Sequence, residues 1–173
     1  VPDNMITVIA GDVDADEVLD TLRETFSGFE RRPRPPIVLP REPPQIGRRF
    51  QRKTGAYKVS RLRWMVHTVS LSHADTPALD VLASIVGSGR SSRLNAVIKE
   101  QRRLAHSIGA WSHTPKDPGL FAISATFDPT REEEVVAAIE EQVNAWHTQP
   151  FTEDEIAKAR RKILTSELSG LQT

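Results

Sequence analysis

The chain opens with an apolar, β-branched run, Met5 to Ala10, that has the length of a strand and ends at Gly11. A helix is expected next, because Asp14 and Glu17 have the spacing of a capping box. Apolar residues then recur at helical spacing up to a stop at Gly28. These are Val18, Leu19, Leu22 and Phe26. The pattern predicts a strand followed by a helix.

Residues 31–53 interrupt this periodicity. Six of the twelve prolines lie between Pro33 and Pro44, a density that excludes a helix or a central strand. The segment also holds eight basic residues against one acid, Glu42. We predict an extended linker. A nucleic-acid-binding arm and a proline-motif ligand are the alternatives, but no aromatic residue stands between the arginines to stack on bases.

The remaining sequence alternates between strand and helix patterns. Strands are expected at Tyr57–Val69, Ala105–Thr114 and Leu120–Phe127, and helices after Asp75, after Ser91 or Ser92, and after the capping boxes Thr130/Glu133 and Thr152/Glu155. Consecutive strands and paired helices, without strict βαβ alternation, indicate an α+β fold. We predict a two-layer sandwich with a largely antiparallel sheet and helices packed on one face.

Composition narrows the class of protein. The chain has 173 residues, 23 basic and 23 acidic, with five His and no Cys, so a disulfide scaffold and a cysteine zinc finger are excluded. Zero formal charge argues against nucleic acid as a partner. No apolar run approaches the roughly 18 residues of a membrane span. The start without Met suggests a fragment, which leaves the compartment open between periplasmic or secreted and cytoplasmic.

No self-sufficient active site is apparent in the sequence. Neither the G-x-S-x-G elbow nor H-E-x-x-H or H-x-x-E-H is present. The string Gly87 to Ser92 (GSGRSS) lacks the Lys of a phosphate loop and is interpreted as a helix–helix turn, with anion contact near Ser91 and Ser92 as the lesser alternative. The histidines are scattered. We therefore predict no catalytic residue, metal ligand or cofactor in this chain.

Four stretches together resemble the pitrilysin/insulinase family of zinc metallopeptidases, relatives of mitochondrial processing peptidase. Val86 to Trp111 (VGSGRSSRLNAVIKEQRRLAHSIGAW) is similar to the family segment in which a glycine-bearing turn precedes Ser-Ser-Arg-Leu, a short helix and a strand. Asn4 to Phe26, Phe121 to Ile139 and Phe151 to Ile163 resemble further family segments in the same order. The resemblance covers nearly the whole chain outside the linker.

The resemblance implies an enzyme of repeated α/β units, in which a zinc-bearing H-x-x-E-H unit faces a metal-free partner across a peptide chamber. Residues 1–30 match the end of one unit, 31–53 the linker, and 54–173 the non-catalytic, peptidase-like domain. We expect a zinc metalloendopeptidase parent whose zinc lies upstream, with this chain inactive alone. Its partners would be a peptide substrate and a zinc-bearing domain, in cis or in another subunit. The alternative is an assembly subunit without peptidase activity.

The same resemblance suggests substrate-binding residues. Where family members place an Arg seven residues before a Tyr, this chain has Lys99 and His106. Lys lacks the planar guanidinium of Arg, and His lacks the phenolic hydroxyl donor of Tyr. Gly87 and Gly89 match the position of a longer glycine-rich substrate loop in some members. We also expect the opening strand–helix unit to dock on the remaining sheet or to pair with another copy as a homodimer, because its strand edge needs cover.

Overall fold

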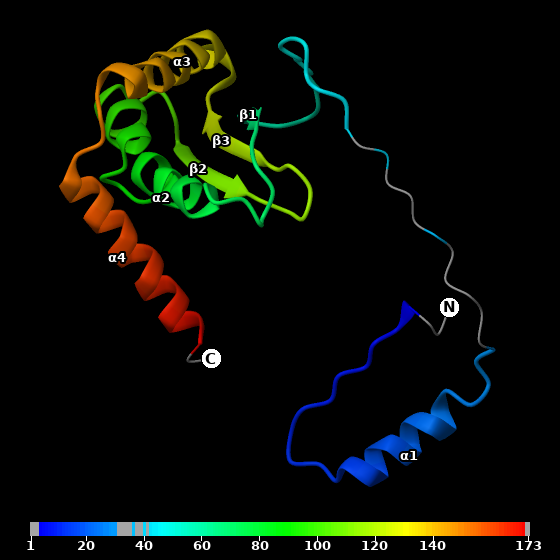
Figure 1. Cartoon of the computed structure of the whole chain (residues 1–173). Helices are drawn as coiled ribbons and strands as arrows, with labels where there is room; N and C mark the ends of the chain where they lie inside the picture. The colour runs from blue at the N-terminus through cyan, green and yellow to red at the C-terminus, as the bar shows by residue number, and fades with distance from the viewer. Residues whose placement is uncertain (1–3, 31–35, 37–39, 41, 172–173) are drawn as a thin grey trace. The chain divides into compact units, whose positions relative to one another are not determined.

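The computed structural model describes residues 4–30, 36, 40 and 42–171. The chain divides into two compact units, Val1–Arg52 and Lys53–Thr173 (Figure 1). The assignment of residues 1–30 to a preceding domain stays a prediction, and much of the predicted linker lies outside the described residues.

The first unit is built around α1 (Ala15–Thr25). Asp14 caps the helix as predicted, because its carboxylate accepts from the backbone N–H of Asp16 at 2.9 Å and of Glu17 at 3.1 Å. The predicted strand at Met5–Ala10 is wrong, since these residues form no ladder. A strand exists only with a hydrogen-bonded neighbour, and no described segment of this unit supplies one. Ile6 is consequently 92% exposed.

The second unit contains a three-stranded sheet in the order β1–β3–β2, with both pairs antiparallel. The strands are β1 (Ser60–His67), β2 (Ser107–His113) and β3 (Leu120–Phe127), and the outer two are shorter than the sequence pattern predicted. The register places Ile123 of β3 opposite both Trp64 of β1 and Ala110 of β2. The predicted α+β fold with an antiparallel sheet is confirmed.

Helices cover one face of this sheet. Alternate β3 residues from Phe121 to Phe127 are buried and join the core, to which α2 (Thr76–Gly87) and α3 (Glu132–Thr148) add Val86 and Ile139. Figure 1 shows these helices on one side of the strands. The opposite face carries exposed residues of β1 and β2, including Arg61, Arg63, Met65 and Trp111.

The other two predicted capping boxes have different outcomes. Thr152 and Glu155 form the full box at the start of α4 (Glu153–Gly170), as predicted. The Thr130/Glu133 box is wrong, because Asp128 accepts from the Thr130 backbone N–H at 2.9 Å and its hydroxyl at 2.7 Å. The chain first makes the 3-10 turn η3 (Pro129–Arg131), and α3 then begins without a side-chain cap. A proline directly after an Asp cap favours that earlier start.

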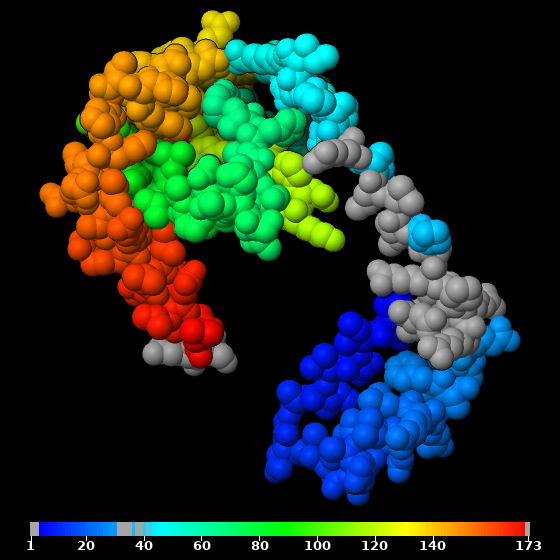
Figure 2. All heavy atoms as spheres, viewed as in Figure 1, coloured from blue at the N-terminus to red at the C-terminus, as the bar shows by residue number. Residues whose placement is uncertain are grey.

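The last helix, α4, is only partly covered. Its first half packs on α2 and buries Ala159. Its second half exposes Leu164 and Leu168, and Leu171 is exposed just after it. Figure 2 shows this half standing clear of the rest of the second unit. No helix in the described parts of the chain is both long and apolar enough to cross a bilayer.

Candidate functional site

The turn that joins α2 to η2 (Asn95–Gln101) holds two of the predicted site residues. Gly87, the last residue of α2, lies directly against β2. A Cβ added there would come within 1.9 Å of the Ala110 backbone nitrogen and 2.6 Å of its Cα. Since backbone atoms cannot give way as a side-chain tip can, only glycine fits between helix and strand. Gly87 thus has a packing role, and its contact with substrate stays a prediction.

Gly89 gives the turn its shape. Its φ of +92° lies in the left-handed region that favours glycine. The Ser92 hydroxyl donates to the Gly89 carbonyl at 2.7 Å, and the Asn95 amide donates to the Ser92 hydroxyl and to the Ile108 carbonyl, each at 2.9 Å. Ser92 and Asn95 are both buried. A helix was predicted to start after Ser91 or Ser92, but η2 begins at Asn95 without a side-chain cap. Asn95, held by Ser92, ties the turn to β2.

The other two predicted residues, Lys99 and His106, lie on either side of the loop that leads into β2. Half-buried Lys99 belongs to η2, a π-helix, and exposed His106 donates its backbone N–H to Thr126 at 2.8 Å. Between them Arg103 adopts a positive φ of 51°. Among the described contacts no hydrogen bond or ion pair joins Lys99 to His106. π-Turns and left-handed non-glycine residues recur at functional sites, but the role of both side chains stays a prediction.

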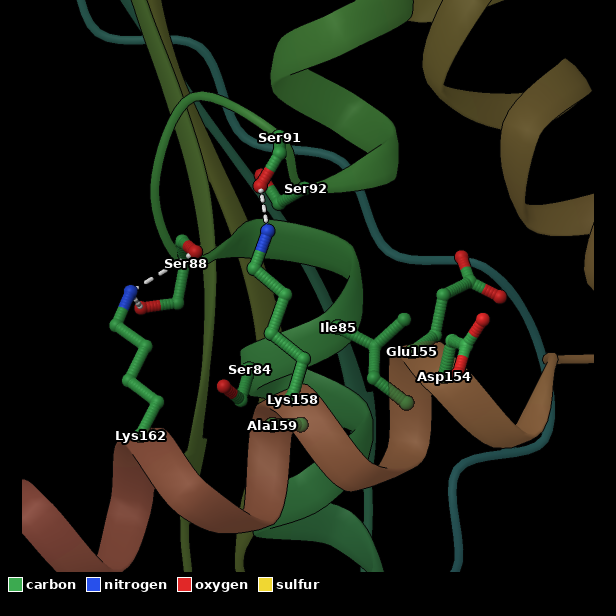
Figure 3. A pocket seen from close by; sticks show the side chains of 10 residues that line it. All are labelled: Ser84, Ile85, Ser88, Ser91, Ser92, Asp154, Glu155, Lys158, Ala159 and Lys162. Atoms are coloured by element: carbon green, nitrogen blue, oxygen red, sulfur yellow. Dashed lines mark hydrogen bonds between the residues drawn. The ribbon is translucent and has the colours of Figure 1, made fainter.

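A cavity of about 180 Å³ lies beside the turn, between α2 and α4 (Figure 3). Lys158 of α4 donates to the Ser91 hydroxyl at 2.5 Å. Lys162, four residues further on, donates to the Ser88 hydroxyl at 2.7 Å and to the Ser88 carbonyl at 2.9 Å. Neither lysine was predicted from the sequence. Their i, i+4 spacing places both amines on one helix face, which was the available signal.

Glu155, which lines this cavity, forms an ion pair with Arg93. The guanidinium makes two hydrogen bonds to the carboxylate, at 2.7 and 2.8 Å, and its other bonds reach the carbonyls of Gln149 and Pro150. It also lies 4.4 Å from the centre of the Phe151 ring. The Arg93 hydrogen bonds, with smaller contributions from Thr152, lower the pKa of Glu155 to about 2. This ion pair connects the first turn of α4 to the segment just before η2.

Within the described ranges, no group of three or more His, Asp or Glu residues is arranged to hold a metal ion. His73 lies 3.7 Å from Asp75, and both are exposed. The groups around the turn are the amines of Lys158 and Lys162, the Ser88 and Ser91 hydroxyls, and the Asp154 and Glu155 carboxylates, the second of which is paired with Arg93.

Comparison with known proteins agrees with this picture. The chain is 28% identical to an uncharacterized zinc protease of Streptomyces coelicolor, over 99% of its own length and 38% of the relative. It is 30% identical to an uncharacterized zinc protease of Mycobacterium tuberculosis, over 99% of the chain and 40% of the relative. Zinc protease PqqE of Helicobacter pylori is 27% identical over 80% of the chain and 33% of the relative. The chain thus spans about two fifths or less of these relatives.

Solved structures share the fold. A protease from Helicobacter pylori matches over 94% of this chain and 40% of the protease chain, with a TM-score of 0.68 and 21% identity. The peptidase M16 inactive domain from Pseudomonas fluorescens matches over 62% of this chain and 26% of the Pseudomonas chain, with a TM-score of 0.59 and 17% identity. The family model for the peptidase M16 inactive domain matches residues 1–163. The chain therefore belongs to the peptidase M16 inactive domain family.

Proposed function

We propose that this chain is the non-catalytic part of a zinc metallopeptidase, where it packs against a zinc-bearing catalytic domain and helps to form the peptide-binding chamber. The observation that carries the proposal is the match to the inactive domain of peptidase M16 over residues 1–163. Relatives named as zinc proteases extend well beyond the matched part. That additional length is where we place the catalytic zinc.

Surfaces of the second unit support a role as a packing partner. Three leucines are exposed in and directly after the second half of α4: Leu164 by 58%, Leu168 by 62% and Leu171 by 83%. The uncovered sheet face adds Met65, 47% exposed, and Trp111, 37% exposed. Apolar side chains grouped in this way mark surfaces that another domain or subunit covers. We assign substrate contact to Lys99 and His106 and to the turn at Gly87 and Gly89, which borders the cavity.

The experiment compares the 173-residue chain with its full-length parent. Zinc is measured by elemental analysis, and hydrolysis of a fluorogenic peptide is measured with and without a chelator. We expect stoichiometric zinc and chelator-sensitive cleavage from the parent and neither from the chain. Zinc binding and cleavage by the chain alone would overturn the proposal. A parent without zinc or activity would favour the assembly-subunit alternative.

A further inference from the structure

The cavity between α2 and α4 has an unusual balance of charge. Lys158 and Lys162 project their amines from one face of α4 toward the turn, and no described carboxylate lies within 4 Å of either amine. Two carboxylates do line the cavity, those of Asp154 and Glu155. In Figure 3 neither carboxylate points toward the amines, and Glu155 is already held by Arg93.

The partners of the two amines are neutral. Lys158 reaches the Ser91 hydroxyl, while Lys162 reaches the hydroxyl and the carbonyl of Ser88. A hydroxyl that accepts from an amine keeps its own O–H free to donate to a third group. Together, α4 and the turn therefore offer two lysine amines and two hydroxyl donors around one space. Such a set matches the acceptors of an oxyanion, and charge-assisted bonds of this type are about twice as strong as neutral ones.

The backbone of the turn keeps this space open. At Gly89 even a Cβ would come within 3.3 Å of the Lys162 amine, so a larger side chain would crowd the site. Ser88 and Ser91 are exposed, so a solute can reach their hydroxyls. The buried Ser92–Asn95 network beneath them fixes the turn. The backbone that carries Ser88 and Ser91 is consequently fixed before a ligand arrives, which lowers the entropy cost of binding.

We propose that Lys158, Lys162, Ser88 and Ser91 form a binding site for an oxyanion, either a phosphate group or a carboxylate. None of these four residues is among those assigned to substrate contact, although Ser88 lies between Gly87 and Gly89 in the same turn. Occupation of the site requires no zinc-bearing domain. If the proposed peptidase role fails its test, the proposal of an oxyanion site still stands. If the oxyanion site fails its test, the proposed peptidase role still stands.

The test uses the full 173-residue chain labelled with ¹⁵N and inorganic phosphate as the probe, at constant ionic strength with chloride as the balancing anion. A second titration uses a short peptide with a free C-terminal carboxylate and its amidated twin. We expect saturable shifts of the amide signals of residues 88–92, with a Kd in roughly the millimolar range. Saturation by phosphate alone identifies a phosphate site, and saturation by the free peptide but not its amide identifies a carboxylate site.

Variants separate this site from general surface charge. Lys158→Gln with Lys162→Gln should weaken binding at least about tenfold, since both charge-assisted contacts are lost. The control, Arg160→Gln with Arg161→Gln, removes the same charge from the same helix and should change the Kd less than about twofold. Ser88→Ala with Ser91→Ala gives a second test if the lysine variant does not fold. Amide signals that shift linearly with anion concentration, without saturation, would overturn the proposal. So would an equal change in Kd in the lysine and arginine variants.

Discussion

The Arg93–Glu155 pair makes the stability of the second unit depend on pH in a calculable way. Lowering the pKa of Glu155 from its ordinary 4.5 to about 2 corresponds to a ceiling of about 3 kcal/mol, at 1.36 kcal/mol per pKa unit. The Glu155 side chain is 30% exposed, so solvent screening reduces this to about 1–2 kcal/mol. Because the folded-state pKa is depressed, the contribution is full above about pH 4.5 and is lost as pH falls toward 2.

Glu155→Gln tests this number, because Gln retains the shape of Glu and can still serve at the third position of a capping box. We expect the variant to lose about 1–2 kcal/mol of unfolding free energy at pH 7 and less than half as much at pH 3. Urea unfolding followed by circular dichroism measures both values. Glu153→Gln, in the same helical turn, is the control and should change stability by less than about 0.5 kcal/mol. An equal loss at both pH values, or an equal loss in the control, would refute the reasoning.

Three further predictions concern packing and substrate contact. Gly87→Ala should cost about 2–3 kcal/mol of unfolding free energy, measured by thermal unfolding, because its Cβ meets backbone. Gly28→Ala, with open space around it, should cost less than about 1 kcal/mol, and similar losses in the two variants would contradict the packing role. Asn95→Ala should cost about 1–3 kcal/mol in urea unfolding by removing the donor to two buried acceptors, and a neutral result would contradict the network. In the parent enzyme, Lys99→Gln with His106→Ala should raise the peptide KM several-fold with kcat little changed. An unchanged KM would contradict the assignment of both residues to substrate contact.

Local patterns in the sequence predicted local structure well. The Thr152/Glu155 box and the Asp14 cap depend on residues two or three positions apart, so spacing alone identified them. At Thr130 the same rule failed, because Asp128 stands two residues earlier and captures the Thr130 N–H first. The strand pattern at Met5–Ala10 also failed, since apolar alternation identifies residues able to pair but not whether a partner strand is available.

The candidate site was harder to predict because it depends on distant contacts. Arg93 and Glu155 are 62 residues apart, and Lys162 is 74 residues from Ser88. Nothing in the spacing of either segment identifies its partner. Gly87 was singled out by resemblance to a substrate loop, whereas the contact that requires glycine there is with Ala110 of β2.

Reconstitution of the parent from two pieces tests the central claim most directly. The zinc-bearing remainder of the parent is prepared without the region that corresponds to this chain, and its kcat/KM for a fluorogenic peptide is measured before and after the chain is added. The account predicts low activity alone and a saturable, chelator-sensitive rise of about tenfold or more with the chain, because a completed chamber orients the peptide. Full activity without the chain, or no rise despite measured binding of the two pieces, would contradict the account.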